Sequence, residues 1–146
     1  MKPVSPQQYF MGLQDILERI GDTNEGVSDY YEKLSEHLKN NTLADLSDAE
    51  YKDIYAEFAD AVDKYKQMEV DIQKLPVPVK LIGMNTNLVK YFKHYVEGTQ
   101  MMLDSLNPTQ KEVNLEQFNQ SDEIQSEMIT RFQVTFSKMI GTQHVH

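Results

Sequence analysis

The stretch SDAEYKDIYAEFADAVDKYKQMEVDIQKL, residues 47–75, decides the fold because apolar residues recur in it with a period of seven. Two rows of this heptad are apolar throughout: Tyr51, Phe58, Tyr65 and Ile72, and beside them Ile54, Ala61, Met68 and Leu75. Two such rows make the apolar face of an amphipathic helix. A half-buried strand would alternate with a period of two, so the stretch predicts a helix over about 48–75.

Signals for helix ends frame this segment. Ser47 and Glu50 have the spacing of a capping box, and Pro76 stops the helix at its other end. The same period of seven recurs in three further segments, which predict helices over about 6–39, 79–106 and 114–140.

The first of these helices begins with Ser5 as N-cap, Pro6 in the first position and Gln8 closing a second capping box. Its apolar rows keep one phase across Gly21 and Gly26. We therefore expect one continuous helix, with a kink between the two glycines as the alternative.

Short connections between these segments make sequential helices antiparallel neighbours. The sequence therefore predicts an all-α fold, an up-down-up-down antiparallel four-helix bundle, in a single domain over residues 1–146.

Composition narrows the classes of function. With 14 Lys and Arg against 23 Asp and Glu, the net charge is -9, which opposes binding to nucleic acids or anionic lipids. The absence of Cys excludes disulfides and thiolate chemistry. No apolar run approaches the roughly 18 residues of a membrane span, so we expect no direct membrane insertion. Residues 1–5 lack the apolar core of a signal peptide, although a leader removed from a longer parent is left open.

Motifs for catalysis or metal binding are missing from the sequence. Di-iron bundles use Glu-x-x-His pairs, and this chain has none. Nucleophile elbows and Gly-rich phosphate loops are also absent. The acidic stripe of Glu50, Asp53, Glu57 and Asp60 lies along one helix face, where side chains cannot converge on an ion. We predict a protein that is no enzyme, with no catalytic residue, cofactor or metal site.

Two groups of residues stand out as candidate sites. Polar residues interrupt the apolar rows at four places that an antiparallel bundle brings to one level, which predicts a buried polar layer of Asn24, Thr99, Asp122 and Gln125. In the alternative, Asp122 and Gln125 turn to solvent and Asn24 caps a kink near Gly26. Three tyrosines beside the apolar rows form a candidate partner-binding patch of Tyr30, Tyr55 and Tyr91.

One part of the chain resembles a known group of proteins. The proline-marked turn at residues 75–78 precedes a long amphipathic helix that carries Leu88, Tyr91, Tyr95, Val96, Gly98 and Met102. This arrangement resembles small helical lipoproteins and surface-associated proteins of Gram-positive bacteria. The resemblance implies a bacterial surface protein outside the cytoplasm, although the lipid-bearing Cys of such proteins is missing.

We therefore expect a non-enzymatic interaction module, a bacterial cell-surface or secreted domain that binds a protein partner or itself. The alternative function is a small-molecule binder or sensor whose ligand lies between the helices, next to Met68, Met84, Met101 and Met102.

Overall fold

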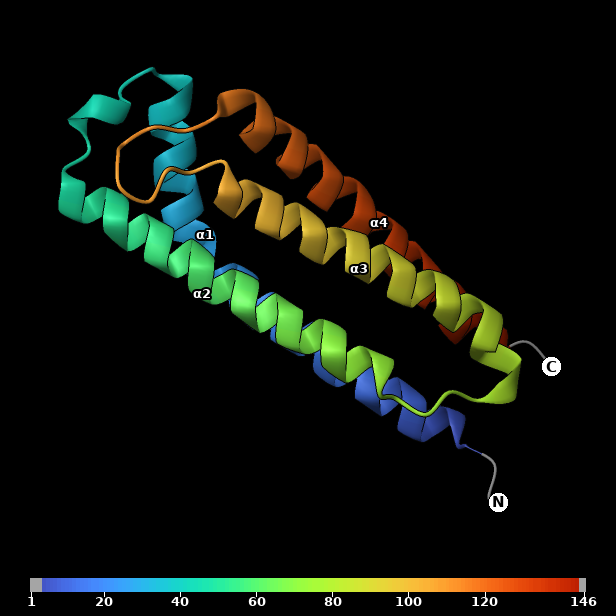
Figure 1. Ribbon diagram of the computed structural model, residues 1–146. Helices are drawn as coiled ribbons and strands as arrows, with labels where there is room; N and C mark the ends of the chain where they lie inside the picture. The colour runs from blue at the N-terminus through green and yellow to red at the C-terminus, as the bar shows by residue number, and fades with distance from the viewer. Residues whose placement is uncertain (1–3, 145–146) are drawn as a thin grey trace.

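The computed structural model describes residues 4–144 and shows four α-helices packed side by side (Figure 1). Sequential helices are antiparallel neighbours, which confirms the predicted all-α four-helix bundle. The helices are α1 (Pro6–Lys39), α2 (Asp48–Gln73), α3 (Ile82–Asp104) and α4 (Leu115–His144), with short 3-10 helices η1 (Leu43–Asp45) and η2 (Val79–Leu81).

The helix ends follow the caps and prolines in part. Ser47 accepts a hydrogen bond from the Glu50 N–H at 3.1 Å and Glu50 accepts one from the Ser47 N–H at 3.3 Å, so this capping box is formed. Ser5 makes no side-chain cap, so the capping box predicted there is wrong. Pro6 presets the backbone dihedral angle of the first turn, and α1 begins without a side-chain cap.

Other predicted helix ends shift by a few residues. α2 ends at Gln73 rather than at residue 75, because a residue that precedes proline avoids the helical conformation and two prolines follow. α3 begins at Ile82, after the 3-10 turn, and ends at Asp104 rather than at residue 106. α4 continues to His144 rather than ending at residue 140.

The first helix is continuous and also bends. Its hydrogen-bonded turns run without a break from Pro6 to Lys39, yet the ribbon changes direction between its dark-blue and light-blue parts (Figure 1). In this region the Thr23 hydroxyl donates to the Arg19 carbonyl at 2.8 Å, a contact that bends helices. Gly21 and Gly26 flank Thr23, and a Cβ at either would meet nothing within 4 Å.

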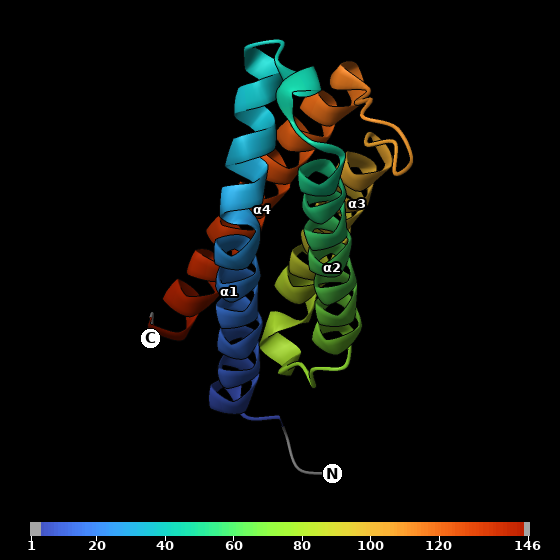
Figure 2. The ribbon, with the colours of Figure 1, turned by 90° about the vertical axis from the view of Figure 1, so that its left-hand side faces the viewer.

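Two clusters of buried residues form the core. One surrounds Phe92 and Phe132, and the other surrounds Phe58 and Leu103 near the α1–α2 connection. Phe132 is 0% exposed and Phe58 is 5% exposed, so both lie in the core. All four helices contribute to both clusters, which follow one another along the bundle. Figure 2 shows α1 and α2 nearer the viewer than α4.

Hydrogen bonds fix the connection between α3 and α4 against the start of α2. The Tyr51 hydroxyl donates to the carbonyls of Asn107 at 2.9 Å and Glu112 at 3.1 Å. The Lys111 ammonium donates to the Leu46 carbonyl at 2.5 Å. This connection therefore holds the N-terminus of α4 at the same end of the bundle as the α1–α2 connection.

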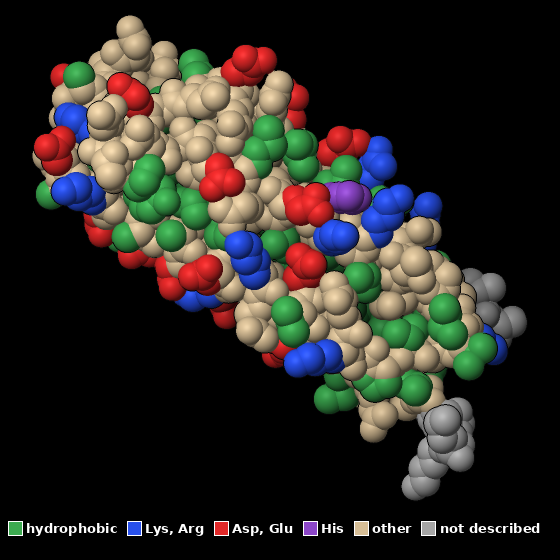
Figure 3. Space-filling view, viewed as in Figure 1, with side chains coloured by type: hydrophobic (Ala, Val, Ile, Leu, Met, Phe, Trp, Pro, Cys, Tyr) green, Lys and Arg blue, Asp and Glu red, His purple; other side chains and the backbone are tan. Residues whose placement is uncertain are grey.

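The face formed by α2 and α3 mixes basic and acidic side chains (Figure 3). Within the described residues, no helix combines the length and apolar character that crossing a membrane requires.

Candidate ligand pocket between the helices

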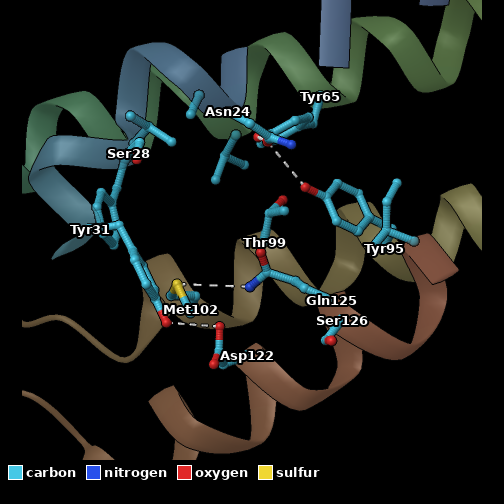
Figure 4. Close-up of a pocket in the computed structure, with 15 residues that line it drawn as sticks. Asn24, Ser28, Tyr31, Tyr65, Tyr95, Thr99, Met102, Asp122, Gln125 and Ser126 are labelled. Carbon is cyan, nitrogen blue, oxygen red and sulfur yellow. Dashed lines mark hydrogen bonds between the residues drawn. The ribbon is translucent and has the colours of Figure 1, made fainter. Parts of the chain in front are cut away.

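A pocket of about 320 Å³ lies where all four helices contribute side chains (Figure 4). Its 15 lining residues are Asn24, Val27, Ser28 and Tyr31 from α1; Phe58, Ala61, Val62 and Tyr65 from α2; Tyr95, Thr99 and Met102 from α3; and Asp122, Gln125, Ser126 and Ile129 from α4. Most of the exposed lining is apolar, and nine of the 15 lining residues bring a polar side-chain group. A pocket of this volume is typical of small-molecule sites.

The pocket lies between α1 and α4 because these two helices are held apart. At one end Phe10 packs edge-on against Phe136, with ring centroids 6.2 Å apart. At the other end Tyr31 stacks on Phe118, with centroids 6.1 Å apart. Large side chains thus bridge the two helices on either side of the bend in α1. The pocket occupies the part of this interface next to Tyr31, over residues 24–31 of α1 and 122–129 of α4.

At one end of the pocket, the Asn24 side chain binds the hydroxyls of two tyrosines. Its Oδ1 accepts hydrogen bonds from Tyr65 and from Tyr95, the second at 3.4 Å. The two rings meet edge to face, with centroids 5.4 Å apart. Burial raises the pKa of both hydroxyls, so both tyrosines are neutral donors at physiological pH. The Asn24 amino group keeps no protein acceptor within residues 4–144 and is available to a ligand.

Asp122 and Tyr31 form a second polar pair at the opposite end (Figure 4). The Tyr31 hydroxyl donates to Asp122 Oδ1 at 3.0 Å. Burial and this carboxylate raise the pKa of Tyr31 to about 12, because both disfavour a second negative charge. Tyr31 therefore stays protonated and orients Asp122.

Thr99 and Gln125 lie between these two pairs. The Thr99 hydroxyl donates to the Val96 carbonyl at 2.7 Å. The Gln125 Nε2 donates to the Gly98 carbonyl at 3.3 Å and contacts Met102 Sδ at 3.8 Å. Gln125 Oε1 accepts no hydrogen bond from the described part of the chain, so it is a free acceptor.

The four residues of the predicted polar layer all line this pocket. The burial predicted for the layer holds for Thr99 alone, because Gln125 is half-buried and Asn24 and Asp122 are exposed. The group surrounds an opening to solvent and does not form a sealed layer. In the alternative that sequence reasoning left open, Asn24 caps a kink; the structure places it near the bend, but its side chain bonds across to α2 and α3.

The three tyrosines of the predicted partner-binding patch are distributed over both halves of the bundle. Tyr30 and Tyr55 are half-buried against the core cluster around Phe58. Tyr91 packs against the other cluster, and the Arg131 guanidinium lies 5.9 Å from the centroid of its ring. These placements do not bring the three rings to one surface.

The methionines predicted beside a ligand are also dispersed. Met102 lines the pocket, whereas Met68 and Met84 pack in or against the core cluster around Phe132. Met101 lies in a shallow groove between α2 and α3. Tyrosines, rather than methionines, supply the large side chains of the pocket wall.

Sequence reasoning missed Ser28, Ser126 and the role of the tyrosines in the pocket. A signal was present in the spacing, because Asn24 with Ser28 and Asp122 with Ser126 are both polar pairs four residues apart. Residues at this spacing share a helix face, so each pair marks a polar strip that faces the other helix. The tyrosines occupy apolar rows and are indistinguishable there from packing residues.

Among the side chains that the structure describes, which end at residue 142, no group of three or more His, Asp or Glu is arranged to hold a metal ion. Comparison with protein-family models, with curated proteins and with solved structures finds no match to this chain. The pocket and its chemistry are therefore the basis for a functional assignment.

Proposed function

We propose that the chain is a non-enzymatic binding protein that holds one small amphipathic molecule in the pocket between α1 and α4. The observation that carries the proposal is the pocket itself, at about 320 Å³ and lined by all four helices. Natural ligand sites start at about this volume and combine apolar walls with a few placed polar groups. The proposal corresponds to the small-molecule binder that the sequence left as the alternative function.

The lining gives such a ligand two environments. Phe58, Val62 and Ile129 offer apolar surface to a hydrocarbon or aromatic body. The amino group of Asn24 and the oxygens of Gln125 and Asp122 offer hydrogen bonds to its polar end. The hydroxyl that meets a carboxylate here is that of Tyr31, and its pKa is raised to about 12 rather than lowered. It is therefore not activated as a nucleophile, which supports binding without chemical conversion.

The protein-interaction module, the location at a bacterial surface and the lack of a cofactor stay predictions from the sequence. The separation of Tyr30 and Tyr55 from Tyr91 leaves the interaction module without the tyrosine patch expected for it. The pocket therefore supports small-molecule binding better.

A titration of the isotope-labelled protein with 4-phenylbutanol, followed by NMR, tests the proposal. We expect saturable shifts in the methyl signals of Ala61, Val62 and Ile129. Ser126→Phe places a ring in the pocket mouth and should weaken binding about tenfold or more. Ser137→Phe, at another exposed serine of the same helix outside the pocket, should leave binding unchanged.

Two results would contradict small-molecule binding. One is the absence of saturable shifts up to the solubility limit of the alcohol. The other is equal weakening by Ser126→Phe and Ser137→Phe, which would place the alcohol outside the pocket. Native mass spectrometry of the freshly purified protein adds an independent check, because a retained ligand appears as a mass above that of the chain.

A further inference from the structure

The charges around the pocket indicate which charge its ligand carries. Among the 15 lining residues, Asp122 is the single Asp, Glu, Lys, Arg or His. Its Oδ1 accepts from Tyr31, while its Oδ2 accepts no hydrogen bond from residues 4–142. A carboxylate at the edge of an apolar pocket, with one oxygen free, favours a positively charged group.

The surroundings of Asp122 do not neutralise this charge. Glu123 and Glu127 share with it a shallow depression on the outer side of α4. The basic residue of that depression, Arg131, donates to Glu127 at 2.6 Å and lies over the ring of Tyr91 on α3. Arg131 therefore contacts Glu127 and Tyr91 and does not pair with Asp122.

The aromatic wall has the same preference for a cation. Tyr31 lies next to Asp122, and Tyr65, Tyr95 and Phe58 line the rest of the pocket. The faces of aromatic rings carry partial negative charge and attract ammonium groups. Because the tyrosine hydroxyls are donors to Asn24 and Asp122, their rings stay neutral and fixed in position.

We infer that the ligand of this pocket is an organic cation, an amine or quaternary ammonium attached to an apolar body. The ammonium group lies at the mouth, between Asp122 and the ring of Tyr31, with Gln125 Oε1 as a further acceptor. The apolar body lies against Phe58 and Val62. This inference rests on the proposed function, since it names the chemical class of the molecule that the pocket binds.

Other charge types fit less well. An anion would meet Asp122 with no lysine, arginine or histidine in the lining to balance it. A hard metal cation needs several oxygen ligands that converge, and the lining supplies one carboxylate. A neutral molecule fills the apolar part but leaves the carboxylate unused.

Three probes that share a phenylalkyl body and differ in charge distinguish a cationic, a neutral and an anionic ligand. They are 4-phenylbutylamine, 4-phenylbutanol and 4-phenylbutyrate. Their dissociation constants are measured by NMR titration of the whole chain at neutral pH and low salt. We expect the amine to bind about tenfold more tightly than the alcohol, and the carboxylate most weakly. Added salt should reduce the advantage of the amine, because the Asp122 side chain is open to solvent.

The variant Asp122→Asn removes the charge and keeps the shape. It should abolish the preference for amine over alcohol while the dissociation constant of the alcohol stays within about twofold. Glu123→Gln is the matched control, since it changes the net charge equally at a neighbouring residue outside the lining. It should retain the preference.

Each outcome decides one question. If the alcohol or the carboxylate binds as tightly as the amine, the pocket is a binding site but the cationic class is wrong. If Glu123→Gln removes the preference as fully as Asp122→Asn, the effect comes from net charge and the role of Asp122 is overturned. If none of the three binds, the proposed function fails together with this inference.

Discussion

Two interfaces of this bundle differ in how closely their helices pack. The α3–α4 interface is a closed seam, without a gap between the helices, whereas the α1–α4 interface is an open seam that contains the pocket. α3 and α4 pack closely along their lengths, and at Gly98 a Cβ would lie 3.0 Å from Gln125 Cγ and 3.1 Å from Ile124 Cγ2. α1 and α4 meet through the ring pairs Phe10–Phe136 and Tyr31–Phe118.

The size of the contacting residues explains this difference. Because glycine has no side chain, α4 approaches the backbone of α3 at Gly98 until side chains of α4 contact it. Little space is left between the two helices. Between the two aromatic pairs, the part nearer Phe10 and Phe136 is filled by large buried side chains such as Phe132 and Ile20. The part next to Tyr31 carries Ser28 and Ser126, which are too small to fill it. The pocket thus follows from side-chain volume along one seam.

The largest expected effect compares a phenylalanine of the closed core with one beside the pocket. Phe132→Ala should lower the free energy of unfolding by about 3–5 kcal/mol, because Phe132 is 0% exposed and its removal leaves a sealed cavity. Phe58→Ala should cost less, since Phe58 lines a pocket that solvent already reaches. Urea denaturation of both variants measures the difference. Equal losses would show that the two regions are packed alike. A loss below about 1 kcal/mol for Phe132→Ala would show that α4 turns another face to the core.

The next effect tests the close approach of α3 and α4. Gly98→Val should cost about 1–3 kcal/mol, because the added methyl groups must displace Gln125 and Ile124. Thermal unfolding followed by circular dichroism gives the change. If the variant is as stable as the parent, the two helices have room to separate and the seam is less tightly closed than the geometry indicates.

A smaller effect concerns the hydrogen bonds across the open seam. Asn24→Leu removes the acceptor of Tyr65 and Tyr95 and should cost about 1 kcal/mol, because water in the open pocket replaces part of the loss. Asn119→Leu, at an exposed position on α4, is the control and should change stability by less than about 0.5 kcal/mol. We expect both variants to keep the oligomeric state of the parent in size-exclusion chromatography. A change of oligomeric state for Asn24→Leu alone would favour a register-setting role for Asn24.

The smallest effect concerns the bend in α1. Gly26→Ala should raise the stability by about 0.5–1 kcal/mol, because the helix is continuous there and the added Cβ meets no atom within 4 Å. Its midpoint in urea, compared with that of the parent, measures the gain. A loss of stability would mean that the bend needs glycine at this position, and that Thr23 with its bond to the Arg19 carbonyl is insufficient to produce it.

Sequence patterns predicted the fold more fully than the site. The heptad rows predicted four helices because burial on one face requires that period, and Ser47 and Pro76 marked two of their ends. The bend in α1 was left open, because glycine permits a change of direction without requiring one. The pattern also shows which residues point inward. It does not show the distance between two helices that are not consecutive in the chain, such as α1 and α4. For α1 and α4, that distance depends on which rings meet, Phe10 with Phe136 and Tyr31 with Phe118, and only the packed structure reveals these pairs.

The seam between α1 and α4 also joins the first helix of the chain to the last. Tyr31 and Asp122, which meet across it, are 91 positions apart, whereas the other three interfaces join helices that follow one another directly. Contacts between sequential helices close short loops and form early, and contacts between distant segments form late. We therefore expect the interface that carries the pocket to form after the three sequential hairpins during folding. We also expect it to be the interface that opens most readily in the native state, so that the pocket can widen around a ligand without global unfolding.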